Sequence, residues 1–182
     1  MTSATEQKIG AEKMAAVRPD IAASTLLVAT ILSGLFAGFF GTYTFSVTRG
    51  LAEADDVTYV ESFQAINNTI RNPWFALVFF GSAPATLFAL IVARKTHRRG
   101  TPLLAAGLGL LILTMVITFA GNVPLNDSLG LVDASNQKAA SEARIDFEDD
   151  WNMLNLARTT TSVLGFACIA VASQLRAKLQ NP

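Results

Sequence analysis

The chain has 182 residues, of which 51% are hydrophobic and 15% charged, and its formal net charge is zero. The charged share is well below the quarter that is typical of soluble domains, so we predict a membrane protein. Zero net charge gives no global basic signature for nucleic acid. A single cysteine, Cys168, and a single histidine, His97, exclude an intrachain disulfide, a multi-cysteine metal site and a histidine metal cluster within one chain.

Four apolar runs are long enough to cross a bilayer, which needs about 20 apolar residues. The runs cover about 21–45, 74–93, 103–120 and 159–175. They predict an all-α fold, a four-transmembrane-helix bundle, with its membrane domain over residues 21–178. A disordered N-terminal tail (1–20) and a short C-terminal tail (179–182) flank this domain. The first run is too long for a signal-peptide core, so we interpret it as a retained span.

Three glycines in the first run, Gly34, Gly38 and Gly41, recur at helical spacing. Small residues let membrane helices approach one another closely, so we predict that this face packs against another helix. The alternative interpretation of the same face is a groove that binds a ligand.

Two polar connections separate the spans and carry signals for short helices. In 48–72, Asp55 and Asp56 are suitable helix starters, and an apolar stripe of helical spacing follows them. Asn72 before Pro73 is typical of an N-cap with proline in the first turn of the next helix. In 121–150, Gly121 can end a helix and Pro124 blocks its simple continuation, so the third span is expected to stop there.

The distribution of basic residues predicts the orientation. The N-terminal tail, the 94–99 loop and the C-terminal tail hold nine of the 14 lysines and arginines and three acids. Loops 48–72 and 121–158 hold five basic and eleven acidic residues. The positive-inside rule therefore places both termini in the cytoplasm and the two structured loops outside, and we predict an integral protein of a bacterial plasma membrane.

With this topology, three polar clusters fall at the same non-cytoplasmic level. Trp151, Asn155 and Arg158 are spaced i, i+4, i+7 and therefore share one helix face. The other two clusters are Asn67, Arg71 and Asn72 with Phe63 in the first loop, and Asn122, Asn126 and Asp127 after the third span. Asparagine amides and an arginine fork can hold a carbonyl or phenol, while tryptophan and phenylalanine can stack on an aromatic ring.

Each of these residues also has a structural interpretation. Asparagines near helix ends are often caps, tryptophan at a membrane boundary is often part of the aromatic belt, and arginine there often reaches toward water. The acidic run that ends in Asp149 and Asp150 is typical of a solvated loop. No Walker loop, Gly-rich dinucleotide turn, HExxH or GxSxG motif occurs, and a Ser-His-Asp hydrolase is disfavoured because no histidine lies on the predicted outer side.

Four pieces of the sequence, taken in order, resemble the anthrone oxygenase-like membrane proteins of the domain-of-unknown-function family DUF1772. The pieces are Gly34-Leu35-Phe36-Ala37-Gly38; Phe63-Gln64-Ala65-Ile66-Asn67 leading to Asn72-Pro73 and Phe75; Asn122-Val123-Pro124-Leu125-Asn126; and Trp151 through Asn155 to Arg158. The resemblance covers about residues 22–175. It implies a four-helix membrane protein, and some members of the family are associated with oxygenation of anthrones to anthraquinones without a known metal or flavin.

Two hypotheses follow. The first is a cofactor-independent monooxygenase of planar phenolic, anthrone-like substrates, with no metal, and with membrane lipids, a hydrophobic aromatic molecule and dioxygen as its partners. Its catalytic residues would be Arg158, Asn126 and Asp127, and the base would be Asp127, another outer carboxylate or water. Its substrate-binding residues would be Asn67, Asn72, Asn122, Trp151, Asn155 and Phe63. The second is a non-enzymatic bundle that binds a lipid or quinone, or that scaffolds a partner. The oligomeric state stays open in both.

Overall fold

The computed structural model describes residues 21–96 and 100–180, and within these ranges every regular element is a helix. The all-α prediction is therefore confirmed. The elements are α2 (Ile21–Thr42), η1 (Tyr43–Val47), α3 (Thr48–Ala52), α4 (Asp56–Thr69), α5 (Pro73–Thr96), α6 (Thr101–Ile117), η2 (Thr118–Asn122), α7 (Val123–Leu129) and α8 (Gln137–Gln180). The predicted tail at 1–20 and His97 lie outside the described residues.

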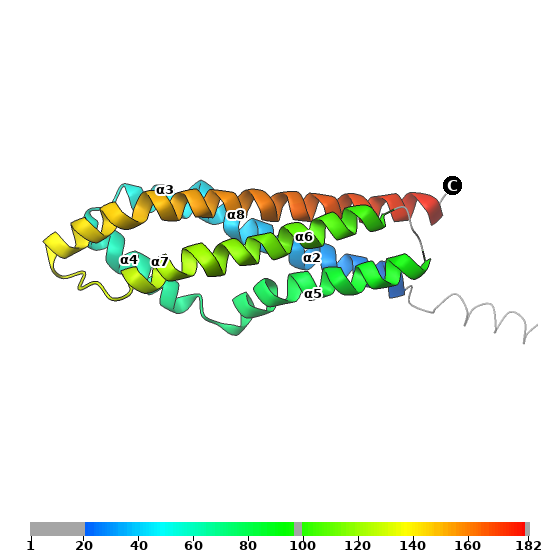
Figure 1. Cartoon of the computed structure of the whole chain (residues 1–182), viewed down its shortest axis with the longest axis horizontal. Coiled ribbons are helices and arrows are strands. Elements are labelled where there is room, and N and C mark those ends of the chain that lie inside the picture. Colours follow the sequence, from blue (N-terminus) through cyan, green and yellow to red (C-terminus); the bar gives the residue numbers. More distant parts are fainter. Residues whose placement is uncertain (1–20, 97–99, 181–182) are drawn as a thin grey trace, which may run out of the picture.

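Four long helices, α2, α5, α6 and α8, run side by side along the molecule (Figure 1). The helical stretches that are long and apolar enough to cross a membrane are Ile21–Ala52, Pro73–Lys95, Thr101–Leu129 and Gln137–Arg176. The start of α2 and the end of α8 lie at the same end of the bundle, and α3, α4, α7 and the first turns of α8 form a layer at the other end (Figure 1). The prediction of four spans agrees with this architecture, and we treat the chain as an integral membrane protein. The interpretation of Asp149 and Asp150 as part of a loop is wrong, because both are exposed but lie within α8.

Two apolar cores lie one above the other along the bundle. The first, between the four long helices, includes Phe36, Phe79 and Ile169, and the second, in the end layer, includes Tyr59 and Phe147. Large apolar side chains on the outside of the long helices stay exposed, as expected where the surrounding medium is lipid; examples are Leu27, Ile31, Phe88, Ile112 and Val116. Phe39 packs against both cores and so marks their junction.

The closest helix crossing lies between α6 and α8, not along the glycines of α2. A Cβ on Gly107 would lie 2.8 Å from Ile169 Cγ1 and 3.0 Å from the carbonyl oxygen of Gly165. In α2, a Cβ on Gly34 would meet the Phe166 ring of α8 at 3.2 Å, so this glycine does face a helix. Gly38 has nothing within 4 Å and Gly41 meets Phe45 of its own chain segment. The predicted packing face is therefore correct for Gly34 alone.

The helix of the third span does not end at Gly121, in contrast to the expectation. Helix α6 passes through the π-helical turn η2 directly into α7, so the chain stays helical to Leu129. Pro124 lies in the first turn of α7, where its missing N–H costs no hydrogen bond. The π-helical turn resets the backbone register before the proline, and helical continuity is kept.

The end layer is tied to the bundle by side-chain bonds to backbone. Asp55 caps α4, as predicted, by accepting hydrogen bonds from the hydroxyl and backbone N–H of Thr58, and these bonds hold the pKa of its carboxyl below the usual range. The cap therefore contributes above the ordinary pKa of an aspartate and is lost as the pH falls through the lowered value. Gln64 Nε2 donates to the carbonyl oxygens of Leu129 and Val132 at 2.8 and 3.0 Å, which joins α4 to the segment after α7.

Arg144 of α8 is the strongest of these ties. Its guanidinium donates to the Glu148 carboxylate at 2.7 Å, to Asp56 at 3.2 Å, and to the backbone carbonyls of Ala52 and Ala54 at 3.0 and 2.8 Å. It also lies 4.5 Å from the centre of the Tyr59 ring. One side chain therefore fixes the turn between α3 and α4 onto α8.

We expect Arg144→Leu to destabilise the folded protein by about 2 kcal/mol, because two carboxylates and two backbone carbonyls lose a mostly buried partner. Thermal unfolding of the detergent-solubilised protein measures the change. The matched control is Lys138→Leu, on the same helix, whose ion pair with Glu142 at 3.7 Å is exposed and contributes little. Equal melting temperatures for the two variants would contradict the assigned role of Arg144.

Candidate active site

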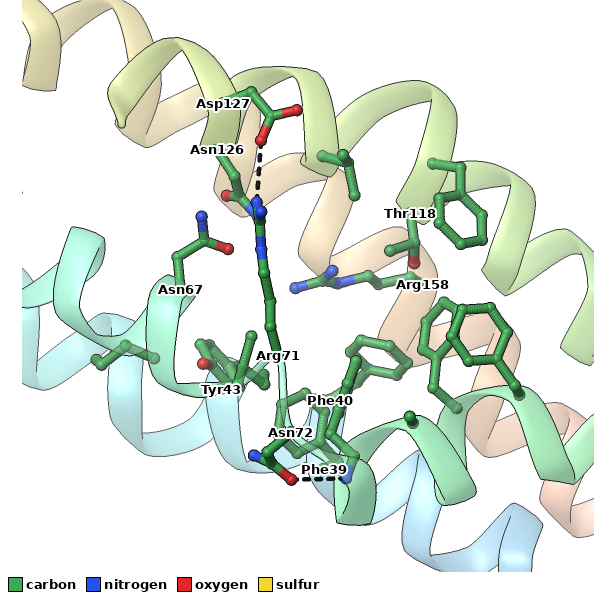
Figure 2. A pocket seen from close by; sticks show the side chains of 18 of the residues that line it. Phe39, Phe40, Tyr43, Asn67, Arg71, Asn72, Thr118, Asn126, Asp127 and Arg158 are labelled. Carbon is green, nitrogen blue, oxygen red and sulfur yellow. Dashed lines mark hydrogen bonds and ion pairs between the residues drawn. The ribbon is translucent and has the colours of Figure 1, made fainter. Parts of the chain in front are cut away.

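A cavity of about 680 Å³ lies where the bundle meets the end layer. Its walls come from α2, η1, α4, α5, η2, α7 and α8, so seven elements converge on it (Figure 2). The volume is within the range of pockets that bind drug-sized molecules. The sequence predicts a functional site where the three polar clusters lie at one level of the bundle. Residues from all three clusters line this cavity.

Two π-helical turns flank the cavity, one in each of two different spans. The turn η1 interrupts the first span and provides Tyr43, and η2 interrupts the third and provides Thr118 and Phe119. Such turns are rare and occur frequently at functional sites, because the extra residue redirects the side chains that follow. Here both turns shape the same cavity.

Aromatic side chains form most of the wall. The lining includes Phe39, Phe40, Tyr43, Phe63, Phe75, Phe79, Phe80, Phe119 and Trp151. Phe80 and Phe119 contact each other across α5 and η2 with nearly parallel rings, 6.2 Å between centroids, and both are about half exposed on the outside of the bundle. The cavity is therefore suited to a flat apolar molecule, and one side of it is closed toward the lipid by two rings.

Arg158 is the buried cation of this cavity, with 5% of its surface exposed. Its guanidinium lies 4.5 Å from the Phe40 ring centre and 4.9 Å from the Trp151 ring centre. Its Nε donates to Asn155 Oδ1 at 3.0 Å. Figure 2 shows the side chain extending into the cavity, so the terminal nitrogens face the space that a ligand would occupy.

Asn155 lies behind Arg158 instead of lining the cavity. Its Nδ2 donates to Thr44 Oγ1 at 2.9 Å, and Thr44 is bonded in turn to the Thr159 hydroxyl at 2.9 Å. Thr44 belongs to η1, so a buried polar chain connects the first π-helical turn to the guanidinium. This arrangement assigns Asn155 to the positioning of Arg158, whereas the sequence predicted contact with substrate.

Trp151 is held by Asn126, since its Nε1 donates to Asn126 Oδ1 at 2.7 Å. The Phe63 ring meets the indole edge to face, with centroids 4.8 Å apart. All three of these predicted site residues line the cavity. The hydrogen bond fixes the plane of the indole, so Asn126 acts on the site through Trp151.

The other predicted residues divide into two groups. Asn67, Asn72 and Asp127 line the cavity, and Asn122 does not. Asn72 Oδ1 caps α5 by accepting from the backbone N–H groups of Trp74 and Phe75, both at 3.0 Å, so its oxygen is already used. Asn122 is fully buried, and its Nδ2 donates to the carbonyl oxygen of Trp151 at 3.3 Å. These two amides hold the backbone that frames the site.

An ion pair marks the polar end of the cavity. Arg71 Nη2 lies 3.1 Å from Asp127 Oδ1, and both side chains are more than half exposed. Figure 2 shows Arg71 running across the cavity from the Asn72 turn to Asp127, with the amide of Asn67 beside it. Among the described residues Asn67 donates and accepts no side-chain hydrogen bond, so its amide is available to a ligand.

Part of the wall was not predicted from the sequence, because the first span contributes Phe39, Phe40 and Tyr43. A signal was present, since Tyr43 follows Phe39 and Phe40 by about one helical turn, beside the glycines that were assigned to packing. Arg71, which belongs to the predicted cluster in the first loop, closes the polar end. In the described part of the chain, no group of three metal-ligating side chains is close enough to hold an ion.

The Asn126–Trp151 bond gives a prediction about ligand binding. We expect Trp151→Phe and Asn126→Ala each to weaken binding of a planar aromatic ligand about tenfold, because each loses one hydrogen bond that orients the indole. The double variant should be little worse than either single one, since both remove the same bond. Fluorescence titration of the purified protein measures the affinities, and fully additive losses would contradict a shared role.

The family model of the anthrone oxygenases matches residues 74–168. The matched region contains the Asn122–Asn126 and Trp151–Arg158 pieces of the resemblance. The Gly34 piece precedes it, and the piece that begins at Phe63 precedes it except for Phe75. No curated protein and no solved structure was found to match the chain. The family match covers more than half of the chain, and with four apolar helices around an aromatic cavity the chain belongs to the anthrone oxygenase family.

Proposed function

We propose that the protein is a cofactor-independent oxygenase of planar phenolic, anthrone-like substrates dissolved in the membrane. The observation that carries the proposal is the position of the Arg158 guanidinium. It is buried, contacts two aromatic rings and lines a cavity whose walls are mostly aromatic. A cation fixed in advance in a dry site stabilises an oxyanion far more than water does. The family membership agrees with this chemistry.

The reaction needs no electron donor other than the substrate. Loss of one proton converts the anthrone CH₂ carbon and its carbonyl into an enolate, whose carbon reacts with dioxygen to form a C–O bond. The peroxide formed takes up a proton to give a hydroperoxide. Loss of the remaining C–H proton and cleavage of the O–O bond then release water and leave the quinone carbonyl, so one CH₂ and one O₂ become one C=O and one H₂O.

In this proposal each cavity residue has a separate task. Arg158 holds the enolate oxygen, Asn67 hydrogen-bonds a second oxygen of the substrate, and Trp151 with Phe63 holds the ring system. Asp127 is the carboxylate nearest the aqueous end, and it passes the carbon proton to water. Its Oδ1 accepts a hydrogen bond from Arg71 Nη2 at 3.1 Å, which holds the carboxylate at the mouth of the cavity.

Oxygen uptake by membranes that contain the protein tests the proposal. With 1,8-dihydroxyanthrone we expect protein-dependent uptake and one quinone formed per O₂, above the slow rate in membranes without the protein. With the 10,10-dimethyl analogue, which has no removable proton at that carbon, uptake should stay at the control level. No excess with the anthrone, together with tight binding of quinones or lipids, would favour a non-enzymatic binding bundle instead.

We also propose that the protein resides in a bacterial plasma membrane with both termini in the cytoplasm, which places the mouth of the cavity outside. The support is the distribution of basic residues between the loops. We expect Leu131→Cys, at a position 89% exposed, to react with an impermeant thiol reagent in intact cells in a Cys168→Ala background. Labelling only after the cells are broken would reverse the orientation.

A further inference from the structure

The charges that line the cavity do not balance. The charged lining residues are Arg71, Asp127 and Arg158. Arg71 and Asp127 neutralise each other at 3.1 Å. Within the described residues no carboxylate lies within ion-pair distance of Arg158, so the empty cavity carries one uncompensated positive charge.

The geometry of Arg158 leaves one direction for a counter-ion. Phe40 and Trp151 lie 4.5 and 4.9 Å from the guanidinium carbon, so aromatic rings occupy its surroundings on two sides. Asn155 takes the Nε hydrogen at 3.0 Å. The terminal nitrogens, which donate no hydrogen bond to another described residue, are left facing the cavity (Figure 2). A planar fork of this kind matches two lone pairs on an anionic oxygen group.

Ring contacts and one neutral amide do not replace a counter-ion. A buried charge that lacks a partner is costly, and charged groups within membrane spans commonly pair with one another or mark a ligand site. Arg158 is too deeply buried, at 5% exposure, to be solvated as a side chain that reaches the interface would be. The missing negative charge must therefore arrive with the ligand.

We infer that the ligand is the counter-ion of Arg158: a planar aromatic molecule that is bound as the monoanion, a phenolate or enolate, and not as the neutral phenol. The inference rests on the proposed function for the class of ligand. On binding, the O–H bond of a phenol, or of the enol tautomer of an anthrone, breaks heterolytically, the electron pair stays on oxygen, and the proton passes to water at the Arg71–Asp127 end. The enol tautomer thus reaches the reactive enolate state through binding, whereas a bound keto form still loses its carbon proton by way of Asp127.

The other groups that face the guanidinium are compatible with this charge state. Tyr43 from η1 is a neutral donor that lines the same wall, and Asp127 from α7 is already paired with Arg71 from the turn before α5. The lining residues from α5 and η2 are apolar or hydroxyl-bearing and bring no charge. The ionisation of a bound ligand is therefore controlled by Arg158.

A phenol that changes colour on ionisation tests the inference directly. The probe is 2-hydroxyanthraquinone, added to the purified full-length protein in detergent, with its absorption recorded between pH 5 and pH 9. An opposite charge at contact distance lowers the ionisation midpoint by about 1–3 pH units, so the bound probe should show the anion spectrum where the free probe is neutral. The 2-methoxy ether, which cannot ionise, should bind at least tenfold more weakly.

Variants assign the effect to one side chain. In Arg158→Leu the bound probe should return to the midpoint of the free probe or lose binding, and in Arg158→Lys the shift should be kept in part. The matched control is Arg49→Leu, an exposed arginine on α3 outside the cavity, which should leave the shift unchanged. An unshifted midpoint in the natural protein, or equal binding of the phenol and its ether, would overturn the inference.

The spectral titration and the oxygen-uptake assay test the two proposals separately. If the probe binds as an anion but no oxygen is consumed, Arg158 still binds an anionic ligand and the oxygenase proposal is wrong. If oxygen is consumed but the bound phenol is neutral, the oxygenase proposal stands and the inference about the charge of the ligand is wrong.

Discussion

Arg158→Leu is expected to lower kcat/KM for anthrone oxygenation by at least about 100-fold, the size typical of removing a preorganised donor to an oxyanion. Leucine keeps an apolar contact with Phe40 and Trp151, so the variant should still fold. We expect this loss because the guanidinium is the buried positive charge of the cavity and its terminal nitrogens face the space where the proposed reaction places the enolate oxygen. Oxygen uptake, normalised to the amount of folded protein, measures the change.

Two companion variants separate charge from geometry. Arg158→Lys retains the charge but loses the planar fork and its bond to Asn155, so an intermediate loss of about tenfold is expected. Asn155→Ala leaves the arginine but removes the acceptor that holds Nε at 3.0 Å, and a loss of similar size should follow, about the value of one hydrogen bond. If Arg158→Leu retains the natural rate, the guanidinium has no part in the reaction.

Gly107→Val is expected to destabilise the folded protein by about 3 kcal/mol, at the upper end of the usual cost of overpacking. A Cβ there would lie 3.0 Å from the Gly165 carbonyl oxygen and 2.8 Å from Ile169, which is fully buried. Backbone atoms of α8 cannot move aside as a flexible side-chain end can, so α6 and α8 must separate. Thermal unfolding in detergent, or retention of the folded form on titration with a denaturing detergent, measures the cost.

The matched control lies two residues further along the same helix. Gly109 has nothing within 4 Å of its Cβ position and is exposed, so Gly109→Val should be neutral or slightly stabilising, because glycine is a poor helix former. The same substitution on opposite faces of α6 is therefore expected to destabilise the protein only at Gly107. A loss of stability at Gly109 equal to that at Gly107 would show that valine in this helix, and not the crossing, is the cause.

The sequence by itself determined the features that depend on neighbouring residues. The length of each apolar run indicates a span, because a bilayer sets the number of residues needed, and four such helices are present. Asp55 and Asn72 cap α4 and α5 as predicted, since a cap involves only residues up to three positions away. The helical spacing of Trp151, Asn155 and Arg158 placed them on one helix face.

Only the tertiary structure decided which of these side chains share the cavity and which support it. Asn126, Asn67 and Arg158 line it, whereas Asn155 lies behind the arginine and Asn122 is buried beside the Trp151 backbone. The difference depends on the rotation of each helix about its axis. The π-helical turns η1 and η2 change that rotation by one inserted residue, and no local pattern in the sequence marks them.

The same reason explains the two corrections to the fold. A regular helix would be expected to end at Gly121 and Pro124, but η2 shifts the register so that the proline occupies a first-turn position of α7. The close crossing at Gly107 and Gly165 depends on the separation and relative rotation of two helices that are distant in the sequence. Composition and periodicity therefore determined the four long helices, while packing between helices determined the site.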